Sequence, residues 1–189
     1  MDWDAIRTAD SALEMGQYGM AIQLYEWIIE KDPECSLAYH NRGRAYSERR
    51  ELEKAIADFS KAIELDPAYG LAFYNRGNIF KECKQYEQAI ADYSRAIEID
   101  PNDGASYNNR AYMHIMLEQF EQALEDIDQS LRLRPDAAPL LFNRAVIHFK
   151  LNKYEQALAD LNKALELGAS VEQVSLLREK ICDAMQATQ

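Results

Sequence analysis

The chain has 189 residues, of which 48% are apolar, and a formal net charge of −11. This apolar fraction is enough for a continuous core, and five prolines and seven glycines are too few for a long disordered segment. Within residues 2–35, eight acidic side chains face two basic ones, and no region is strongly basic. Because nucleic-acid binding needs a basic face, we expect no nucleic-acid partner, and a bias of the amino end toward basic partners.

The sequence carries no signal for a membrane or for an oxidising compartment. No apolar run approaches the roughly 18 residues of a membrane span, so membrane insertion is not expected. The chain opens with acidic residues, unlike the basic and apolar start of a secretory leader. Its cysteines, Cys35, Cys83 and Cys182, are odd in number and far apart, which is typical of reduced thiols. We therefore predict a cytoplasmic protein.

The dominant feature of the chain is a period of 34 residues. Proline recurs at this interval, as Pro33, Pro67, Pro101 and Pro135. An Asn-Arg pair followed by Gly or Ala recurs at the same interval, beginning at Asn41, Asn75, Asn109 and Asn143. A fixed period of this length predicts stacked copies of one helical hairpin.

Five units follow one another and form one predicted domain. Each unit should contain a first helix, a short turn, and a second helix that ends before the next proline, because proline cannot continue a helix. The units span residues 2–35, 36–69, 70–103, 104–137 and 138–171. The turns are expected near Gly16, Arg50, Lys84, Glu118 and Asn152. A position within these units is called a column below, numbered from the first residue of each unit.

Some columns hold only small residues and others mostly bulky ones. Column 8 holds Ala or Gly and column 20 holds Ala in all five units, which lets successive helices approach closely. Columns 4, 17 and 24 are mostly aromatic or aliphatic. This pattern resembles the tetratricopeptide repeat (TPR) family over residues 2–171. The resemblance implies an all-α fold, a right-handed α-solenoid or superhelix of helix–turn–helix units.

The two ends of the array depart from this pattern. The first unit has Ala5 and Ala12 where bulky residues are usual, and the fifth ends in Gly168-Ala169 instead of proline. Atypical end units are expected in a stack, since each has only one neighbour.

Residues 172–189 are predicted to form a capping helix and a short tail. Ser170 and Gln173 have the spacing of a capping box at its start. Apolar residues then recur at helical spacing, namely Val171, Val174, Leu177, Ile181 and Met185. We expect this stripe to cover the open end of the fifth unit. An amphipathic segment for a membrane or a partner is less favoured, because the outer face is not basic.

Arginine and aspartate recur together in columns 7 and 23. The arginines are Arg42, Arg76, Arg110 and Arg144, and the aspartates are Asp58, Asp92, Asp126 and Asp160. In the first unit both are absent, replaced by Thr8 and Leu24. This joint loss indicates an Arg–Asp pair, because an unpaired inward charge is costly. The spacing leaves open whether the pairs lie within or between units, and an arginine array for phosphate is the less favoured interpretation.

Column 6 holds an asparagine ladder, formed by Asn41, Asn75, Asn109 and Asn143. Helical spacing places it at the edge of a concave groove lined by the first helices. A primary amide both donates and accepts, so it can bind a peptide unit without recognising its side chain. The ladder resembles that in the repeats of O-linked N-acetylglucosamine transferase, which implies binding of an extended peptide backbone. The alternative is that each Asn bonds to a loop of the adjacent hairpin.

Around this ladder the predicted groove changes character along the chain. Its polar and basic residues lie toward the amino end, and its apolar and aromatic residues toward the carboxyl end. The candidate binding residues are His40, Arg44, Tyr74, Asn78, Asn108, Tyr112, Met116 and Phe142. The last of these, together with Phe149, could instead be covered by the terminal helix, and for Phe149 we favour that interpretation.

Other site types find little support. Many TPR proteins clamp an acidic carboxyl-terminal tail with lysines and an arginine, but the matching columns here hold His40, Ala105 and Asn109, so no chaperone-tail clamp is expected. His114 and His148 share a column with Tyr46 and Phe80, which favours core histidines over a metal site. No phosphate loop or catalytic constellation is present, so we predict no enzyme, no cofactor and no metal.

The sequence therefore predicts a non-enzymatic scaffold or adaptor that holds an extended peptide or a partner helix in the concave groove. The alternative is a regulatory or assembly subunit that uses convex or end surfaces; an acidic-tail co-chaperone is less favoured. The sequence leaves self-association and the identity of the protein or peptide partner open.

Overall fold

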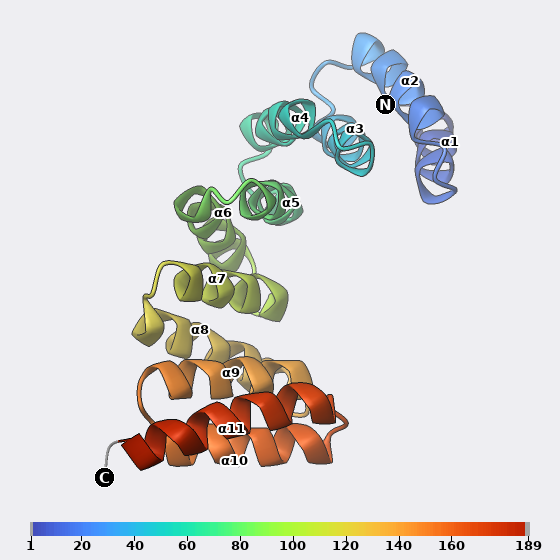
Figure 1. Ribbon diagram of the computed structural model, residues 1–189. Coiled ribbons are helices and arrows are strands. Elements are labelled where there is room, and N and C mark those ends of the chain that lie inside the picture. Colours follow the sequence, from blue (N-terminus) through green and yellow to red (C-terminus); the bar gives the residue numbers. More distant parts are fainter. Residues whose placement is uncertain (1, 188–189) are drawn as a thin grey trace. The chain divides into compact units, whose positions relative to one another are not determined.

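The computed structural model describes residues 2–187, which form eleven α-helices and no strand (Figure 1). The helices are α1 (Trp3–Glu14), α2 (Tyr18–Lys31), α3 (Ser36–Glu48), α4 (Leu52–Leu65), α5 (Gly70–Glu82), α6 (Tyr86–Ile99), α7 (Gly104–Met116), α8 (Phe120–Leu133), α9 (Ala138–Lys150), α10 (Tyr154–Glu166) and α11 (Val171–Ala187). The all-helical fold of tandem hairpins is thus confirmed.

Each hairpin turns at the same column. The residue there adopts a left-handed backbone conformation in all five hairpins. Its φ angle is 73° at Gly16, 63° at Arg50, 58° at Lys84, 57° at Glu118 and 57° at Asn152. The predicted turn positions are therefore confirmed. Glycine adopts this conformation freely at Gly16 and asparagine tolerates it at Asn152, whereas the side chains of the other three turns are strained.

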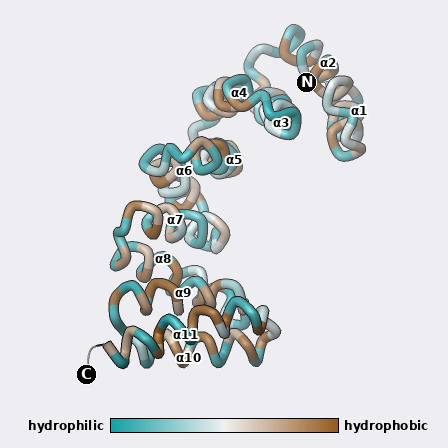
Figure 2. Tube along the Cα trace, in the orientation of Figure 1, coloured by the Kyte–Doolittle hydropathy of each residue, from teal (hydrophilic) through white to brown (hydrophobic). Residues whose placement is uncertain are grey.

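The chain divides into two compact units, residues 1–100 and 101–189. In unit 1, α1 packs with α2, α3 with α4 and α5 with α6, and α2 and α4 each contact the hairpin that follows. In unit 2, α7 packs with α8 and α9 with α10, and α8 contacts α9. Apolar and polar residues are mixed along the helices (Figure 2), and each helix has residues buried in the core.

The small columns permit close helix contact, as expected. The alanines of column 20 are all 0% exposed, and the bulky residues of column 24 pack beside them. At Gly77 of column 8, an added Cβ would lie 2.9 Å from the Tyr93 ring, so α5 and α6 approach too closely for a larger residue. This packing fixes how each first helix presents its outer face.

The Arg–Asp pairs lie within hairpins, which resolves the alternative that the spacing left open. In each of four hairpins, the arginine Nε and Nη2 donate to the two carboxylate oxygens of the aspartate over 2.6–2.8 Å. The aspartates are 4–6% exposed. The remaining nitrogen also links hairpins, since Nη1 of Arg76 donates to Ser60 and Nη1 of Arg144 to Asp128, both over 2.8 Å. These guanidinium groups thus make hydrogen bonds that stabilise the fold.

The terminal helix α11 packs on α10 and α9. The backbone N–H of Gln173 donates to Ser170 Oγ over 3.4 Å at its start, where the capping box was predicted. Val174, Leu177 and Ile181 are buried against the fifth hairpin, but Val171 is 69% exposed. Val171 is the first residue of the helix and extends beyond the surface that the helix covers.

Candidate partner-binding surface

In unit 1, His40 and Asn41 lie beneath the outer surface of α3. His40 is only 3% exposed and Asn41 only 5% exposed. The Asn41 amide donates to Asp10 of α1 over 2.9 Å, and its carbonyl oxygen lies 3.0 Å from His40 Nδ1. Tyr25 of α2 donates its hydroxyl to the same Asp10 oxygen over 2.6 Å. These bonds join three helices, so His40 and Asn41 support the surface from within.

His40 also connects α3 to the third hairpin. Its Nε2 lies 2.9 Å from the amide nitrogen of Asn75, and its Nδ1 lies 3.0 Å from the Tyr69 hydroxyl. An amide nitrogen can only donate, so Nε2 accepts and the ring proton resides on Nδ1. Burial lowers the pKa of His40 to about 4, and the hydrogen bond with Asn41 opposes this only partly. The ring is therefore neutral near pH 7.

The accessible part of this surface is a hollow of about 210 Å³ between α3 and α5. Arg44, Ser47 and Glu48 line it from α3, and Asn75 and Asn78 line it from α5. Arg44 is exposed, and among residues 2–187 no carboxylate lies within ion-pair distance of its guanidinium. The hollow therefore offers amide groups, the carboxylate of Glu48 and one guanidinium that is available to a ligand.

A second cation, Lys81, lies one turn beyond Asn78 on α5. Its Nζ donates to Asn78 Oδ1 over 3.3 Å, and the Tyr93 hydroxyl donates to the same oxygen over 2.8 Å. Burial lowers the pKa of Lys81, and no described carboxylate pairs with it. Tyr74 packs against Tyr93, with ring centroids 6.0 Å apart. Unit 1 thus presents two cations without an acidic partner.

In unit 2, α7 presents two large apolar side chains to solvent. Tyr112 is 46% exposed and Met116 is 39% exposed, and their spacing of four places them on one face of the helix. One turn earlier, Asn108 accepts a hydrogen bond from the Asn143 amide of α9 over 3.2 Å. Asn109 is half-buried. This surface is more apolar than that of unit 1, as the sequence indicated.

The terminal helix covers part of the apolar surface of α9. Phe142 and Phe149 are half-buried and pack against the cluster that contains Val174 and Leu177 of α11. This agrees with the interpretation favoured for Phe149 and extends it to Phe142. Beside Phe142, a hollow of about 700 Å³ opens toward residues 167–170. Sequence reasoning did not identify this hollow, although the loss of proline at the end of the fifth unit was its signal.

The asparagine column joins neighbouring hairpins. Asn41 bonds to Asp10, Asn75 to His40 and Asn143 to Asn108, and each partner lies on the first helix of the preceding hairpin. This arrangement is close to the alternative of internal bonding, except that the partner is a helix and not a loop. Asn75 and Asn143 remain half-buried, so both still reach the surface.

The described residues show no arrangement typical of a metal centre. Within residues 2–187, His, Cys, Asp and Glu side chains form no group of three or more that could hold an ion. His114 and His148 pack instead beside the ion pairs, with Nε2 3.8 Å from Asp126 and 3.7 Å from Asp160. Across the same residues, every helix is too short or too polar to cross a bilayer.

Solved structures with a similar fold include several TPR proteins. YrrB, described as a TPR protein with an unusual peptide-binding site, has a TM-score of 0.82 and 21% identity over 93% of this chain and 90% of its own. PilF from Pseudomonas aeruginosa has a TM-score of 0.81 and 20% identity, covering 97% of this chain and 83% of its own. The first TPR of Spaghetti (RPAP3), bound to the HSP90 peptide SRMEEVD, is 26% identical with a TM-score of 0.59, covering 62% of this chain and 93% of its own.

The search of curated proteins gave no significant match. Four family models, each described as a tetratricopeptide repeat, match residues 6–70, 70–103, 93–125 and 111–181. Together they span nearly all the hairpins and part of α11. The chain belongs to the tetratricopeptide repeat family.

Proposed function

We propose that this protein is a non-enzymatic scaffold or adaptor that binds an extended peptide or a partner helix on the outer surface of its first helices. Proteins of similar fold support this proposal, since YrrB is described by its peptide-binding site and the RPAP3 repeat was solved with a bound peptide. Packed hairpins hold the surface side chains in place, which reduces the entropy lost on binding.

The observation that carries the proposal is the open hollow between α3 and α5. An amide such as Asn75 or Asn78 can donate to and accept from a peptide unit, and a guanidinium such as Arg44 can bind a carboxylate through two parallel hydrogen bonds. Lys81 nearby is partly buried without an acidic partner. An acidic side chain of the ligand would compensate this charge, so we infer a preference for a peptide with an acidic residue at this position.

The surface of unit 2 favours a different side chain. Tyr112 and Met116 are exposed apolar anchors on one face of α7, and such residues dominate the energetics of many interfaces. We therefore expect the ligand, or a second segment of it, to place an apolar side chain against α7.

The chaperone-tail clamp remains the less favoured alternative. The RPAP3 structure contains an acidic HSP90 peptide, but the clamp position at His40 is buried here and its imidazole is neutral near pH 7. Ala105 and Asn109 supply no charge at the other clamp positions. A regulatory or assembly subunit that uses an end surface is the second candidate function, and the exposed Met20 and Trp27 of the first hairpin favour it.

Peptides selected from a random phage-displayed library against the full chain test the proposal. In isothermal titration calorimetry, Arg44→Glu or Tyr112→Ala should weaken a selected peptide by at least about tenfold, because each removes an exposed anchor. Lys61→Glu makes the same charge reversal on the second helix α4 and should leave the affinity within about twofold. Binding that ignores both surface variants but is lost with Lys61→Glu overturns the proposal.

A further inference from the structure

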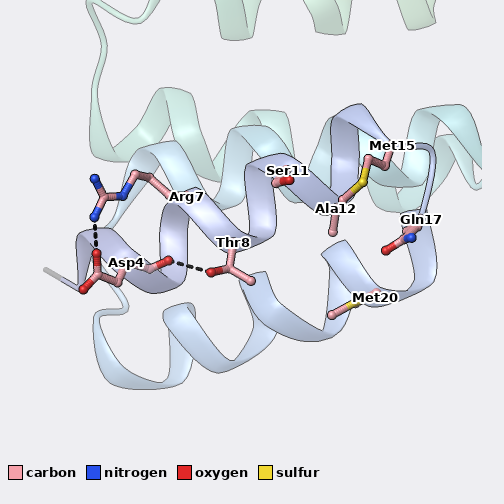
Figure 3. Close-up of a pocket in the computed structure, with 8 residues that line it drawn as sticks. All are labelled: Asp4, Arg7, Thr8, Ser11, Ala12, Met15, Gln17 and Met20. Atoms are coloured by element: carbon pink, nitrogen blue, oxygen red, sulfur yellow. Dashed lines mark hydrogen bonds and ion pairs between the residues drawn. The ribbon is translucent and has the colours of Figure 1, made fainter.

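The first hairpin leaves one face of α1 and α2 exposed. Both helices pack on each other and on α3. On another face lies a hollow of about 390 Å³. It is lined by Asp4, Arg7, Thr8, Ser11 and Ala12 of α1, by Met15 and Gln17 of the turn, and by Met20 of α2. Figure 3 shows these side chains along α1, with Met20 reaching the hollow from the neighbouring helix.

In later hairpins the same columns receive a helix from the hairpin before. Arg76, which occupies the column of Thr8, donates to Ser60 of α4 over 2.8 Å. Tyr46, which occupies the column of Ala12, donates its hydroxyl to Glu26 of α2 over 3.4 Å. Ile79, which occupies the column of Ser11, is only 4% exposed. The repeat therefore uses this face to bind an α-helix.

Two substitutions make the face of the first hairpin different from the others. Thr8 and Ala12 are much smaller than the arginine and aromatic or histidine residues of the same columns, which creates the hollow. The Thr8 hydroxyl donates to the Asp4 backbone carbonyl over 2.8 Å, and Arg7 pairs with the Asp4 carboxylate. The face thus has room for a bulky apolar side chain. It lacks the column 7 arginine, whose Nη1 in later hairpins donates to a polar side chain of the preceding hairpin.

The edge of this face is apolar where other hairpins are polar. Met20 occupies a column that holds Lys54 in the second hairpin and glutamine in the remaining three. Trp27 occupies a column that holds Lys61, Arg95, Gln129 and Lys163 in the other hairpins. These two side chains are 50% and 42% exposed, and a spacing of seven places them on one side of α2. Large apolar residues at exposed positions that are otherwise polar indicate a binding surface.

We propose that this end surface, formed by Thr8, Ala12, Met15, Met20 and Trp27, docks an amphipathic α-helix of another protein with net positive charge. The later hairpins supply the precedent for a helix, and the hollow with its apolar edge calls for an apolar face on that helix. The positive charge follows from residues 2–35, where eight acidic side chains face two basic ones.

A second copy of the chain is a poor match for this surface. Each second helix, α2, α4, α6, α8 and α10, carries net negative charge. In the later hairpins those helices also meet an arginine of column 7, which the first hairpin lacks. Like charge and the missing arginine therefore both disfavour self-docking.

The test uses the full chain and a synthetic helical peptide of about 20 residues, long enough for helix formation, made of leucine, alanine and lysine with the leucines on one face. Titration followed by two-dimensional NMR should shift the amide signals of Thr8, Ala12, Met15 and Met20 first. A scrambled peptide of identical composition should bind at least about tenfold more weakly, because it presents no apolar face.

Two matched variants separate docking from general charge attraction. Met20→Lys reproduces the second hairpin's Lys54 and should weaken the peptide at least about tenfold, whereas Gln88→Lys adds the same charge in the same column of the third hairpin and should change the affinity by less than about twofold. Equal effects of the two variants, or equal binding of the scrambled peptide, overturn the proposal. Sedimentation that shows dimers abolished by Met20→Lys also overturns it, since the occupant is then a second copy.

Discussion

The two units build the same ion pair with different surroundings. In unit 1, the guanidinium carbons of Arg42 and Arg76 lie 5.9 Å and 5.8 Å from the ring centroids of Tyr46 and Phe80. In unit 2, the same column holds His114 and His148, whose Nε2 atoms lie 3.8 Å and 3.7 Å from the paired aspartates. The bidentate geometry of the pairs is nonetheless the same in both units.

This difference shows what column 11 requires. A planar ring that covers the ion pair is sufficient, and the ring can be aromatic or imidazole. An imidazole brings an additional requirement, because each ring nitrogen needs a partner when it is buried. His114 Nδ1 has Gln119 Oε1 at 2.7 Å, whereas His148 Nδ1 is buried without a hydrogen-bond partner. The recurrence of histidine in unit 2 therefore reflects packing around the pair.

The largest expected effect comes from breaking the pair in each unit. Arg76→Leu leaves Asp92, which is 4% exposed, as an uncompensated buried charge and should lower the free energy of unfolding by about 3–5 kcal/mol. Burial and the charge of Arg144 lower the pKa of His148, while Asp160 at 3.7 Å raises it, so removing Arg144 favours a protonated ring beside Asp160. Arg144→Leu should therefore cost less. Urea unfolding followed by circular dichroism measures both.

A double substitution distinguishes a lost pair from lost packing. Arg76→Leu combined with Asp92→Leu should recover more than half of the stability lost by Arg76→Leu alone, since no charge then remains buried. If the double variant is no more stable than the single one, the pair is not the source of the effect. If Arg76→Leu and Arg144→Leu lower the free energy of unfolding equally, His148 does not compensate for the lost arginine and the predicted difference between the units is wrong.

Acid should affect unit 1 through His40. Its pKa is lowered to about 4 in the folded chain by burial, against a usual value of 6.5, so the unfolded chain binds the proton more tightly. This contribution to stability is complete above pH 6.5 and decreases as the pH falls toward 4, by about 2 kcal/mol at pH 5. Unit 2 has Asn108 in the same column of α7, and its own histidine of lowered pKa is His148 on α9, where burial acts in the same direction.

Hydrogen exchange at pH 7.5 and pH 5 can resolve the two units. Amides of α3 and α5 should lose more protection on acidification than amides of α7, which carries Asn108 in the column of His40, after correction for intrinsic exchange rates. His40→Gln should make the loss in α3 and α5 similar to that in α7. A loss that persists in this variant would assign the acid sensitivity to other groups.

The buried nitrogen of His148 makes a smaller, stabilising prediction. His148→Phe restores the residue type of Phe80 and removes an unsatisfied polar atom, so the free energy of unfolding should rise by about 1 kcal/mol. His114→Phe is the matched control and should give no gain, because it removes the hydrogen bond to Gln119. Similar gains at both positions would show that ring hydrophobicity alone is responsible.

The hairpins were predictable because one period encodes them. Proline and the small columns repeat at 34 residues, so helix ends, turns and close contacts follow from spacing alone. The existence of the Arg–Asp pairs also followed, since both residues are lost together at Thr8 and Leu24. The sequence did not show whether the arginine and aspartate pair within a hairpin or between hairpins, because spacing along the chain does not give the distance across a helix pair.

The binding surface was less predictable, since a column gives the direction of a side chain but not its depth. His40 occupies the same column as the more accessible Tyr74, yet bonds to Asn41, Tyr69 and Asn75 draw it into the interior. The end surface at Met20 was missed for another reason. Its signal is an apolar residue in a second-helix column that is otherwise polar, whereas the predicted groove contained only residues of the first helices.

The smallest expected effect concerns the turns, where the two units can be compared at one backbone position. A side chain in the left-handed conformation costs about 1 kcal/mol, and glycine avoids this cost but adds about 0.5–1 kcal/mol of unfolded-chain entropy. Lys84→Gly and Glu118→Gly, at φ 58° and 57°, should therefore raise stability by about 0.5 kcal/mol or less. Asn152→Gly should change little, because asparagine tolerates this conformation. Thermal melts measure the series, with Gly16→Ala as the reverse change, expected to destabilise by about 0.5 kcal/mol or less. A loss of stability in Glu118→Gly alone would mean that its side chain supports unit 2 in a way that Lys84 does not support unit 1.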